Sequence, residues 1–356
     1  MTVEERFAMN ASIRRALVAA ACVMAIAGSA AAQNRLGSTC SAPPRIDCPE
    51  ANCPIDKVRA EGNAVEPKTG RKFFLDFPCD LKPNEEVVFV LSLHGAGSIG
   101  NWQRHYFPIV DLKEKYRLIV ATPTAATSEP TRRWVAEADD AFLQNLVDAV
   151  FSEFGHKNIR SFWLAGHSQG GITARRMVCS DYFKTRVDGW LSLSGGRIGQ
   201  TRFTFGRGGT ATPAASDSAP GSGATSGGGQ APAAEQLPDC DFSFIFTAGQ
   251  LEIAGLPETS PWAQKYGCAS RVRRPDVVDT RAGYVTATDQ SRGPGWGRFA
   301  RPGTAEAYVY PNCRDGKVVA DFIRLDKGHT EGLEPNVLEE IVKSMVSARG
   351  GKARTR

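Results

Sequence analysis

The chain has no apolar run of the roughly 20 residues that a membrane-crossing helix requires. Its apolar run at residues 16–28 is shorter than that. The body of the chain also lacks an excess of one charge. The formal charge is +5, and the three Arg and two Glu of residues 1–32, with four basic side chains in residues 349–356, account for it. We therefore expect neither a stable membrane association nor a nucleic-acid partner.

Metal-binding spacings are missing too, because the cysteines near the start form no C-x-x-C pair and no His follows them at zinc-finger spacing. We expect neither a metal nor another cofactor. The chain has nine Cys, of which an even eight follow residue 32, and in an exported chain this predicts four disulfides. The sequence does not choose their pairing. The eight are Cys40, Cys48, Cys53, Cys79, Cys179, Cys240, Cys268 and Cys313.

Residues 1–32 are typical of a secretory signal peptide. Arg14 and Arg15 precede the apolar run, and the three alanines at residues 30–32 supply the small side chains that a signal peptidase requires. We expect cleavage before Gln33 and a secreted or periplasmic protein. The paired arginines leave twin-arginine export as an alternative to general secretion.

Strands and helices alternate over residues 84–348, after an irregular Cys- and Pro-rich segment at residues 33–83. Apolar and β-branched runs predict strands at residues 86–93, 118–121, 159–165, 190–194, 242–247, 307–310 and 318–325. Helical spacing of apolar residues predicts helices at 142–154, 172–180 and 335–348. Such alternation predicts one α/β domain with a mostly parallel sheet and helices on both faces.

Two segments depart from this pattern. Residues 208–234 consist mainly of Gly, Ala, Ser, Thr and Pro and contain no bulky apolar side chain. Because such a composition buries too little surface to offset its ordering entropy, we expect a disordered, low-complexity insertion within the domain, with a domain linker as the alternative. We expect the basic tail, residues 349–356, to be a solvated, frayed end.

The segment Gly-His-Ser-Gln-Gly at residues 166–170 fits the motif G-x-S-x-G. The pattern alone is weakly specific, but here a buried strand is expected directly before it and a helix directly after it. A strand-to-helix elbow holds its central residue in a strained turn and exposes it. Ser168 is therefore the expected nucleophile, and a glycine-rich turn with a capping serine is the alternative.

A serine hydroxyl is a poor nucleophile unless a base takes its proton. In folds with this elbow, the acid and the histidine follow the serine along the chain. Of the five histidines, only His329 does so, in the loop between the last predicted strand and the last predicted helix. We expect His329 to be the base.

An acid must orient this imidazole and stabilise its charged form, and it belongs on a loop after a strand. Glu252 follows the predicted strand at residues 242–247 and is favoured for this role. Asp276 and Asp279 remain open as alternatives.

The anionic intermediate of acyl transfer needs preorganised hydrogen-bond donors. The amide of Gln169, directly after the nucleophile, is the first expected donor. The amide of Ala96 is the second, with Gly97 in reserve, because Leu-His-Gly-Ala-Gly at residues 93–97 follows the first predicted strand. We expect His94 in this loop to bond the backbone and not to act as a base.

Together, these motifs resemble the secreted polyhydroxybutyrate-depolymerase family of α/β-hydrolases, which also includes feruloyl and acetyl xylan esterases. They are LHGAG, Trp102, WVAEADD at residues 134–140, GHSQGG at 166–171, a Cys after the elbow helix and a late Gly-His. The resemblance covers about residues 87–345. It implies an α/β-hydrolase fold, Ser168 as nucleophile, His329 as base, and Asp139 or Asp140 as supports of the site. Where the family commonly has Asp after a Gly-Thr turn, this chain has Gly-Gln-Leu-Glu.

These features predict a secreted, monomeric serine esterase that forms an acyl-enzyme with a small-molecule or polymer-borne ester. A serine peptidase on the same fold is one alternative, and a noncatalytic carbohydrate- or aromatic-binding protein on a hydrolase scaffold is another. Four tryptophans in predicted loops are candidates either for lining an aryl or sugar subsite or for closing the core. They are Trp102, Trp134, Trp262 and Trp296.

Overall fold

The computed structural model describes residues 33–41, 58, 62–197, 237–284, 293–298 and 300–355. The predicted signal peptide, the predicted insertion at residues 208–234, Cys48 and Cys53 lie outside the described residues. Apart from Gln33, the described residues belong to one compact unit, Asn34–Arg356.

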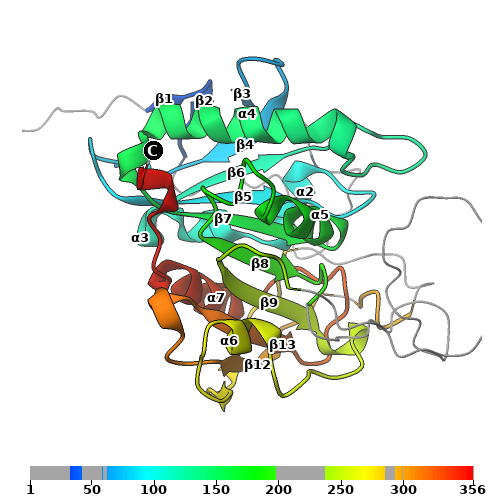
Figure 1. Ribbon diagram of the computed structural model, residues 1–356. Helices are drawn as coiled ribbons and strands as arrows, with labels where there is room; N and C mark the ends of the chain where they lie inside the picture. The colour runs from blue at the N-terminus through cyan, green and yellow to red at the C-terminus, as the bar shows by residue number, and fades with distance from the viewer. Residues whose placement is uncertain are drawn as a thin grey trace, which may run out of the picture. The chain divides into compact units, whose positions relative to one another are not determined.

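An 11-stranded sheet runs through the described part of this unit, in the order β10-β12-β13-β9-β8-β7-β5-β6-β4-β3, with β11 paired to β12 (Figure 1). Neighbours from β6 to β13 are parallel, and the pairs at both edges are antiparallel. The parallel strands are β6 Leu118–Pro123, β5 Val87–Leu93, β7 Ile159–His167, β8 Gly189–Leu193, β9 Ser243–Gly249 and β13 Val319–Arg324. The edge strands are β3 Ala64–Val65, β4 Lys72–Asp76, β10 Val272–Arg273, β11 Val277–Val278 and β12 Thr304–Val309.

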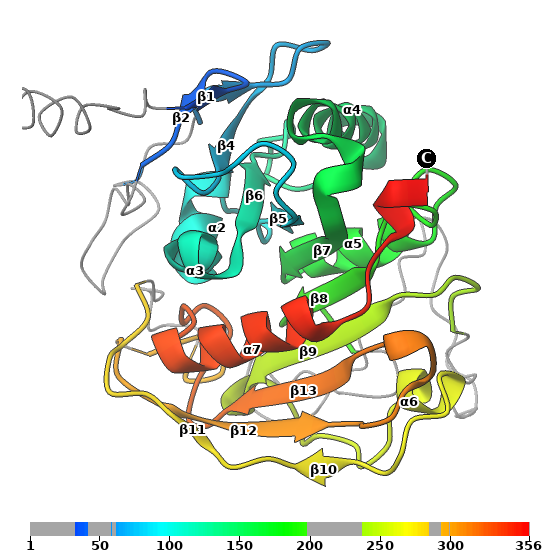
Figure 2. The ribbon, with the colours of Figure 1, turned by 90° about the vertical axis from the view of Figure 1, so that its left-hand side faces the viewer.

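Helices cover both faces of this sheet (Figure 2). Alternate side chains of β5 enter two separate hydrophobic clusters, Phe89 and Leu91 in one, Val88 and Val90 in the other. The first cluster contains residues of α4 Ala136–Phe154, α5 Gln169–Val178 and α6 Pro261–Lys265, and the second contains residues of α2 Gly100–Tyr106 and α7 Pro335–Ser347. A mostly parallel sheet between two helical layers, with a strand–turn–helix at Ser168, confirms the predicted α/β-hydrolase fold.

Short elements make up the rest of the described secondary structure. They are the hairpin strands β1 Asn34–Arg35 and β2 Ser38–Thr39, helix α3 Lys113–Tyr116, and the 3-10 turns η2 Ile109–Leu112, η3 His156–Asn158, η4 Gln250–Glu252, η6 Arg314–Gly316 and η7 Lys352–Thr355. No helix within the described ranges combines the length and the apolar character needed to cross a bilayer.

The described part of the segment at residues 33–83 is more ordered than we expected. Its strand β4 pairs antiparallel with β6, and β3 pairs with β4, so this segment builds one edge of the main sheet. Phe73, Phe74 and Leu75 of β4 are all buried. Three consecutive apolar residues between charged neighbours show no alternation, which is why the sequence pattern does not predict this strand.

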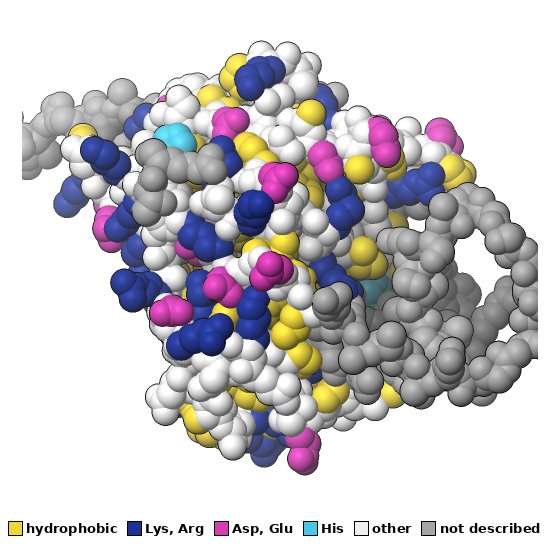
Figure 3. Space-filling model, viewed as in Figure 1, with side chains coloured by type: hydrophobic (Ala, Val, Ile, Leu, Met, Phe, Trp, Pro, Cys, Tyr) yellow, Lys and Arg dark blue, Asp and Glu magenta, His cyan; other side chains and the backbone are white. Residues whose placement is uncertain are grey.

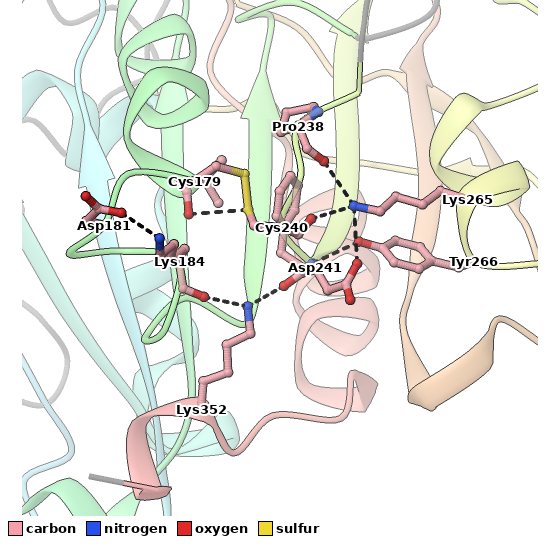
Figure 4. The surroundings of a disulfide bond; sticks show 11 residues. Cys179, Asp181, Lys184, Pro238, Cys240, Asp241, Lys265, Tyr266 and Lys352 are labelled. Atoms are coloured by element: carbon pink, nitrogen blue, oxygen red, sulfur yellow. Dashed lines mark hydrogen bonds and ion pairs between the residues drawn. A yellow bond between two sulfur atoms is a disulfide. The ribbon is translucent and has the colours of Figure 1, made fainter.

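Two disulfides join the described residues, Cys179–Cys240 and Cys268–Cys313. The first links the end of α5 to the segment before β9 (Figure 4). Lys265 donates from Nζ to the carbonyl oxygens of Pro238 (3.0 Å) and Cys240 (2.7 Å) beside this bond. The bond and these contacts fix the start of β9.

The expectation of a frayed basic tail is wrong for the described residues 349–355. Ala353 is 1% exposed and belongs to the first hydrophobic cluster. Lys352 donates from Nζ to the carbonyl oxygen of Lys184 (3.1 Å) and to that of Asp241 (Figure 4). Burial lowers the pKa of Lys352 to about 8. A single buried alanine among basic residues has no apolar periodicity, so composition alone suggests a solvated end.

The surface carries charges of both signs. In the view of Figure 3, basic and acidic side chains are scattered among each other. Four large apolar side chains of the described residues are exposed: Val65, Ile172, Val272 and Val278. Ile172 is the one close to Ser168, because its amide bonds the carbonyl oxygen of Ser168 at 3.1 Å.

We predict that Ala353→Asp destabilises the protein, because it forces a carboxylate into the hydrophobic cluster. The melting temperature should fall by more than about 5 °C in thermal unfolding. Arg354→Ala is the matched control. It removes only a partly exposed ion pair with Glu86, so its melting temperature should change little. Equal melting temperatures for the wild type and Ala353→Asp would show that the tail does not pack.

Candidate active site

The turn between β7 and α5 holds Ser168 in a strained conformation. Its backbone has φ 51° and ψ −121°, in the region that side-chain-bearing residues rarely adopt. Its amide donates to the carbonyl oxygen of Leu193 at 2.9 Å, and its carbonyl oxygen accepts from Gly171 at 2.9 Å. Gly170 must lack a side chain, since a Cβ there would collide with the carbonyl group of Leu93. The expected nucleophile elbow is therefore present.

His329 lies in the loop after β13 and is bound to this elbow. The ring of His167, the residue before Ser168, donates from Nε2 to the carbonyl oxygen of His329 at 2.9 Å. The rings of His167 and His329 have centroids 4.8 Å apart. Burial, and secondarily His329, hold the pKa of His167 well below its usual range. His167 is therefore a neutral support that fixes the His329 loop beside the elbow.

Glu252, in the turn η4 after β9, contacts His329 directly. Its Oε2 lies 2.6 Å from Nδ1 of His329. Its Oε1 accepts from Oγ of Ser194 at 2.6 Å and from the amide of Gly249 at 2.5 Å. The carboxylate is fully buried. Three donors thus hold both oxygens, and the imidazole is oriented with Nε2 away from the acid.

The other two candidate acids lie elsewhere. Asp276 forms an exposed ion pair with Arg273, at 2.7 Å. Asp279 accepts from the amides of Asn336 (2.6 Å) and Val337 (3.1 Å) in the first turn of α7. Asp279 therefore caps the first turn of α7, and Asp276 belongs to a surface ion pair. Of the three candidates, Glu252 is the one that the fold brings to the histidine.

A loop at residues 293–298 packs against His329, and the sequence pointed to it only through Trp296, one of four candidate subsite tryptophans. The amide of His329 donates to the carbonyl oxygen of Gly295 at 3.0 Å, and that of Thr330 donates to Trp296 at 2.9 Å. The Trp296 ring lies 5.1 Å from the His329 ring, centroid to centroid. Among the four loop tryptophans, Trp296 is thus the one that contacts the histidine.

A buried carboxylate holds these two loops together. Glu331 accepts from the amides of Gly328 (3.0 Å) and Arg298 (3.1 Å) at Oε1, and from Arg301 at Oε2 (2.9 Å). Gly328 precedes His329, and Arg298 belongs to the loop that carries Trp296. In the sequence, the one sign of this contact is a Glu two residues after His329. A Glu at that spacing is too common to be recognised as a functional residue.

One expected oxyanion donor lies in the elbow and the other in the loop after β5, which packs against the elbow, since a Cβ added to Gly95 would lie 3.2 Å from Cβ of Ser168. Gln169 begins α5, and its side chain is paired with the backbone of Trp134, accepting at 3.1 Å and donating at 2.9 Å. Ala96 is exposed in the loop after β5. Gly97, the reserve candidate, donates its amide to the carbonyl oxygen of Arg132 at 2.7 Å. That bond leaves Ala96 as the better donor of the pair.

His94 supports this loop, as expected. Its Nδ1 donates to the carbonyl oxygen of Gly95 at 2.7 Å, and its Nε2 accepts from the amide of Ala125 at 3.0 Å. Its carbonyl oxygen accepts from the Trp134 indole at 2.8 Å. Burial lowers the pKa of His94 to about 4. With both ring nitrogens engaged and the ring neutral, His94 braces the loop.

Asp139 fixes the loop between β6 and α4, and Asp140 does not. Asp139 is 1% exposed and accepts from the amides of Ala126 and Val135, each at 3.0 Å, and from Arg71 at 2.9 Å. Asp140 pairs with Arg176 near the surface. Arg71, just before β4, was missed by sequence reasoning because it lies in the segment that we expected to be irregular.

The remaining tryptophans serve the core. Trp134 and Trp262 are 5% and 0% exposed and belong to the first hydrophobic cluster. Trp102 is 8% exposed and stacks on Tyr106, with ring centroids 5.8 Å apart. Within the described ranges, no group of three or more His, Cys, Asp or Glu side chains is arranged to hold a metal.

Comparison with known proteins gives fold-level likeness only. No protein-family model matches the chain, and no curated protein matches it. An acetyl xylan esterase structure from Aspergillus awamori aligns with 12% identity and a TM-score of 0.41, over 76% of this chain and 93% of that one. A propionate-bound esterase from Thermogutta terrifontis aligns with 14% identity and a TM-score of 0.27, over 38% of this chain and 54% of that one.

A soluble variant of the Saccharomyces cerevisiae monoglyceride lipase, in complex with a substrate analog, aligns with 22% identity and a TM-score of 0.29, over 37% of this chain and 42% of that one. The alignments with the Thermogutta esterase and this lipase thus cover about half or less of those chains. Activity must therefore be inferred from the site itself.

The lowered pKa of His94 predicts acid sensitivity. Between the ordinary His pKa of about 6.5 and the folded value, the unfolded state binds a proton that the folded state does not, so stability falls as pH falls through this window. His94→Gln keeps an acceptor for Ala125 and removes this titration. From about pH 7.5 to about pH 5, the wild type should lose about 1 to 2 kcal/mol more than the variant in urea unfolding. Equal losses would contradict the prediction.

Proposed function

We propose that this chain is a serine hydrolase of carboxylic esters that acts through an acyl-enzyme. The observation that carries the proposal is the contact of Nδ1 of His329 with the buried carboxylate of Glu252 at 2.6 Å, in a loop hydrogen-bonded to the residue before Ser168. A buried acid, an oriented imidazole and a serine on a strained elbow are the parts that acyl transfer requires.

In this mechanism, Oγ of Ser168 attacks the ester carbonyl carbon while Nε2 of His329 takes the hydroxyl proton. The negative charge of Glu252 stabilises the imidazolium that forms. The amides of Gln169 and Ala96 are the proposed donors to the anionic oxygen of the tetrahedral intermediate.

The intermediate collapses when the alcohol leaves with the proton held by His329, which gives the acyl-serine. A water molecule then attacks the acyl carbonyl carbon and gives its proton to the same Nε2. The second intermediate releases the carboxylic acid and returns the proton to Ser168.

For the substrate, we propose an aryl, acetyl or hydroxyalkanoate ester, either free or polymer-borne. The ground for this choice is that the sequence motifs resemble the polyhydroxybutyrate-depolymerase and feruloyl esterase family. The half-buried Trp296 beside His329 is an apolar surface suited to one side of such a substrate. Hydrolysis rates across a panel of the three ester types distinguish these substrates.

Export and a monomeric state complete the proposal. The two disulfides Cys179–Cys240 and Cys268–Cys313 support an oxidising compartment, either secreted or periplasmic. A serine peptidase and a noncatalytic binding protein on the same scaffold are the alternatives. A peptidase would cleave peptide amides as well as esters, and a binding protein would turn over neither.

We predict that Ser168→Ala and His329→Ala each leave less than about a hundredth of wild-type turnover of p-nitrophenyl acetate, because the members of such a site act as a unit. Glu252→Gln should lower turnover by several orders of magnitude, and Glu252→Asp should lower it partially, since the shorter side chain must still reach His329. Steady-state kinetics on purified, folded variants measure both effects.

Two aspartates provide the matched controls for this series. Asp276→Asn removes only an exposed ion pair and should keep wild-type turnover. Asp279→Asn weakens the cap of α7, so it should lower the melting temperature and not the turnover. Normal turnover in Glu252→Gln together with an inactive Asp279→Asn would reject Glu252 as the acid and keep the serine and the histidine.

A further inference from the structure

Two cysteines outside the observed disulfides lie next to each other at the edge of the sheet. Cys40 follows β2 and Cys79 follows β4, and both are free thiols in the structure. The two strands lie side by side, since Oγ of Ser38 donates to the carbonyl oxygen of Leu75 at 2.8 Å. The two cysteines continue these neighbouring segments, Cys40 two residues after Ser38 and Cys79 four residues after Leu75, and the Cys40 thiol is one of the neighbours that raise the pKa of Cys79. The fold therefore brings together two sulfurs that are distant in the sequence.

The surroundings of Cys79 do not suit a reactive thiol. Burial, and secondarily the Cys40 thiol, raise the pKa of Cys79 to about 12. Nζ of Lys113 lies 3.9 Å from its Sγ and opposes this shift without reversing it. A thiol with such a pKa stays protonated near neutral pH, whereas nucleophilic and metal-binding cysteines act as thiolates. In the described part of the chain, the neighbour with which Cys79 can react is Cys40.

We infer that Cys40 and Cys79 form a further disulfide, one that neither the sequence pattern nor the bonds seen among the described residues specify. The oxidant is a disulfide of a thiol oxidoreductase or a small-molecule disulfide. The Cys40 thiolate attacks it and releases one thiol. The Cys79 sulfur then attacks the mixed disulfide, passes its proton to the departing sulfur, forms the Cys40–Cys79 bond and releases the second thiol. Two protons and two electrons pass from the cysteines to the oxidant.

This bond ties the β1–β2 hairpin to the main sheet. The noncovalent contacts of the hairpin include the Ser38 bond, the amide of Val65, which donates to the carbonyl oxygen of Leu36 at 2.9 Å, and the ion pair of Arg35 with Glu153 at 3.0 Å. A covalent link closes the loop between residues 40 and 79, which restricts the unfolded chain and so stabilises the folded one. The bond lies outside the proposed catalytic groups, so its loss should leave the chemistry intact.

Peptide mapping tests the pairing directly. Free thiols of the full-length exported protein are blocked with N-ethylmaleimide, and the protein is digested with trypsin without reduction. Trypsin places the four N-terminal cysteines in three separate peptides. Cys40 falls in the peptide 36–45, and Cys48 and Cys53 share the peptide 46–57. Cys79 falls in the peptide 73–104, because Pro83 blocks cleavage after Lys82.

The inference predicts that mass spectrometry finds the peptide 36–45 joined to 73–104, and that reduction separates them. Alkylation of Cys40 or Cys79 would overturn it. A bond from either of these peptides to 46–57 would overturn it as well.

Variants give an independent test of the same bond. Cys40→Ser, Cys79→Ser and the double variant should all lower the melting temperature by a similar amount, about 5 °C, because each loses the same single link. Turnover per folded molecule should stay at the wild-type value in all three. The double variant Cys179→Ser/Cys240→Ser, which removes an observed disulfide, is the matched control. Single effects that add up in the double variant would contradict a shared bond.

Discussion

A fully buried carboxylate, that of Glu252, is the constraint on which the rest of the site depends. A charge removed from water destabilises a protein by several kcal/mol unless nearby donors satisfy it. Here Ser194 at the end of β8, Gly249 at the end of β9 and His329 after β13 supply those donors. Three neighbouring strands must therefore end in register for the carboxylate to be satisfied, and this same requirement places the imidazole.

Two further buried carboxylates organise the loops around this centre. Asp139 gathers the amides of Ala126 and Val135 together with Arg71, and so holds the loop that Gln169 contacts through Trp134. Glu331 joins the loop of His329 to the loop of Trp296. Charge-assisted bonds from backbone amides are stronger and shorter than neutral ones. Each carboxylate therefore makes an irregular segment rigid where function needs it.

The sequence predicted the parts that local pattern and chain order control. The elbow at Ser168 was predictable because a buried strand, a glycine-rich turn and a helix follow one another without a gap. His329 was predictable because it alone among the histidines follows the serine and lies in a loop after a strand. Glu252 was favoured on similar grounds, although only the fold separates it from Asp276 and Asp279.

The parts that depend on long-range contacts were not predictable. Arg71 bonds to Asp139, and Glu331 bonds to a loop more than 30 residues before it in the chain. Neither Arg71 nor Glu331 lies in a local sequence pattern that identifies its distant partner. The strand β4 has three consecutive buried apolar residues and no alternation, so its local pattern does not indicate a strand. Ala353 is a single buried apolar residue among basic ones, so the composition of the tail indicates a solvated end although this side chain is packed.

The most direct test of the account is covalent labelling of the serine. A fluorophosphonate is attacked by an activated hydroxyl and leaves a stable phosphonyl ester whose mass identifies the residue. The account predicts one adduct per molecule on Ser168, lost in Ser168→Ala and strongly slowed in Glu252→Gln. Absence of labelling in the folded wild-type protein, or an adduct on a residue other than Ser168, would contradict it.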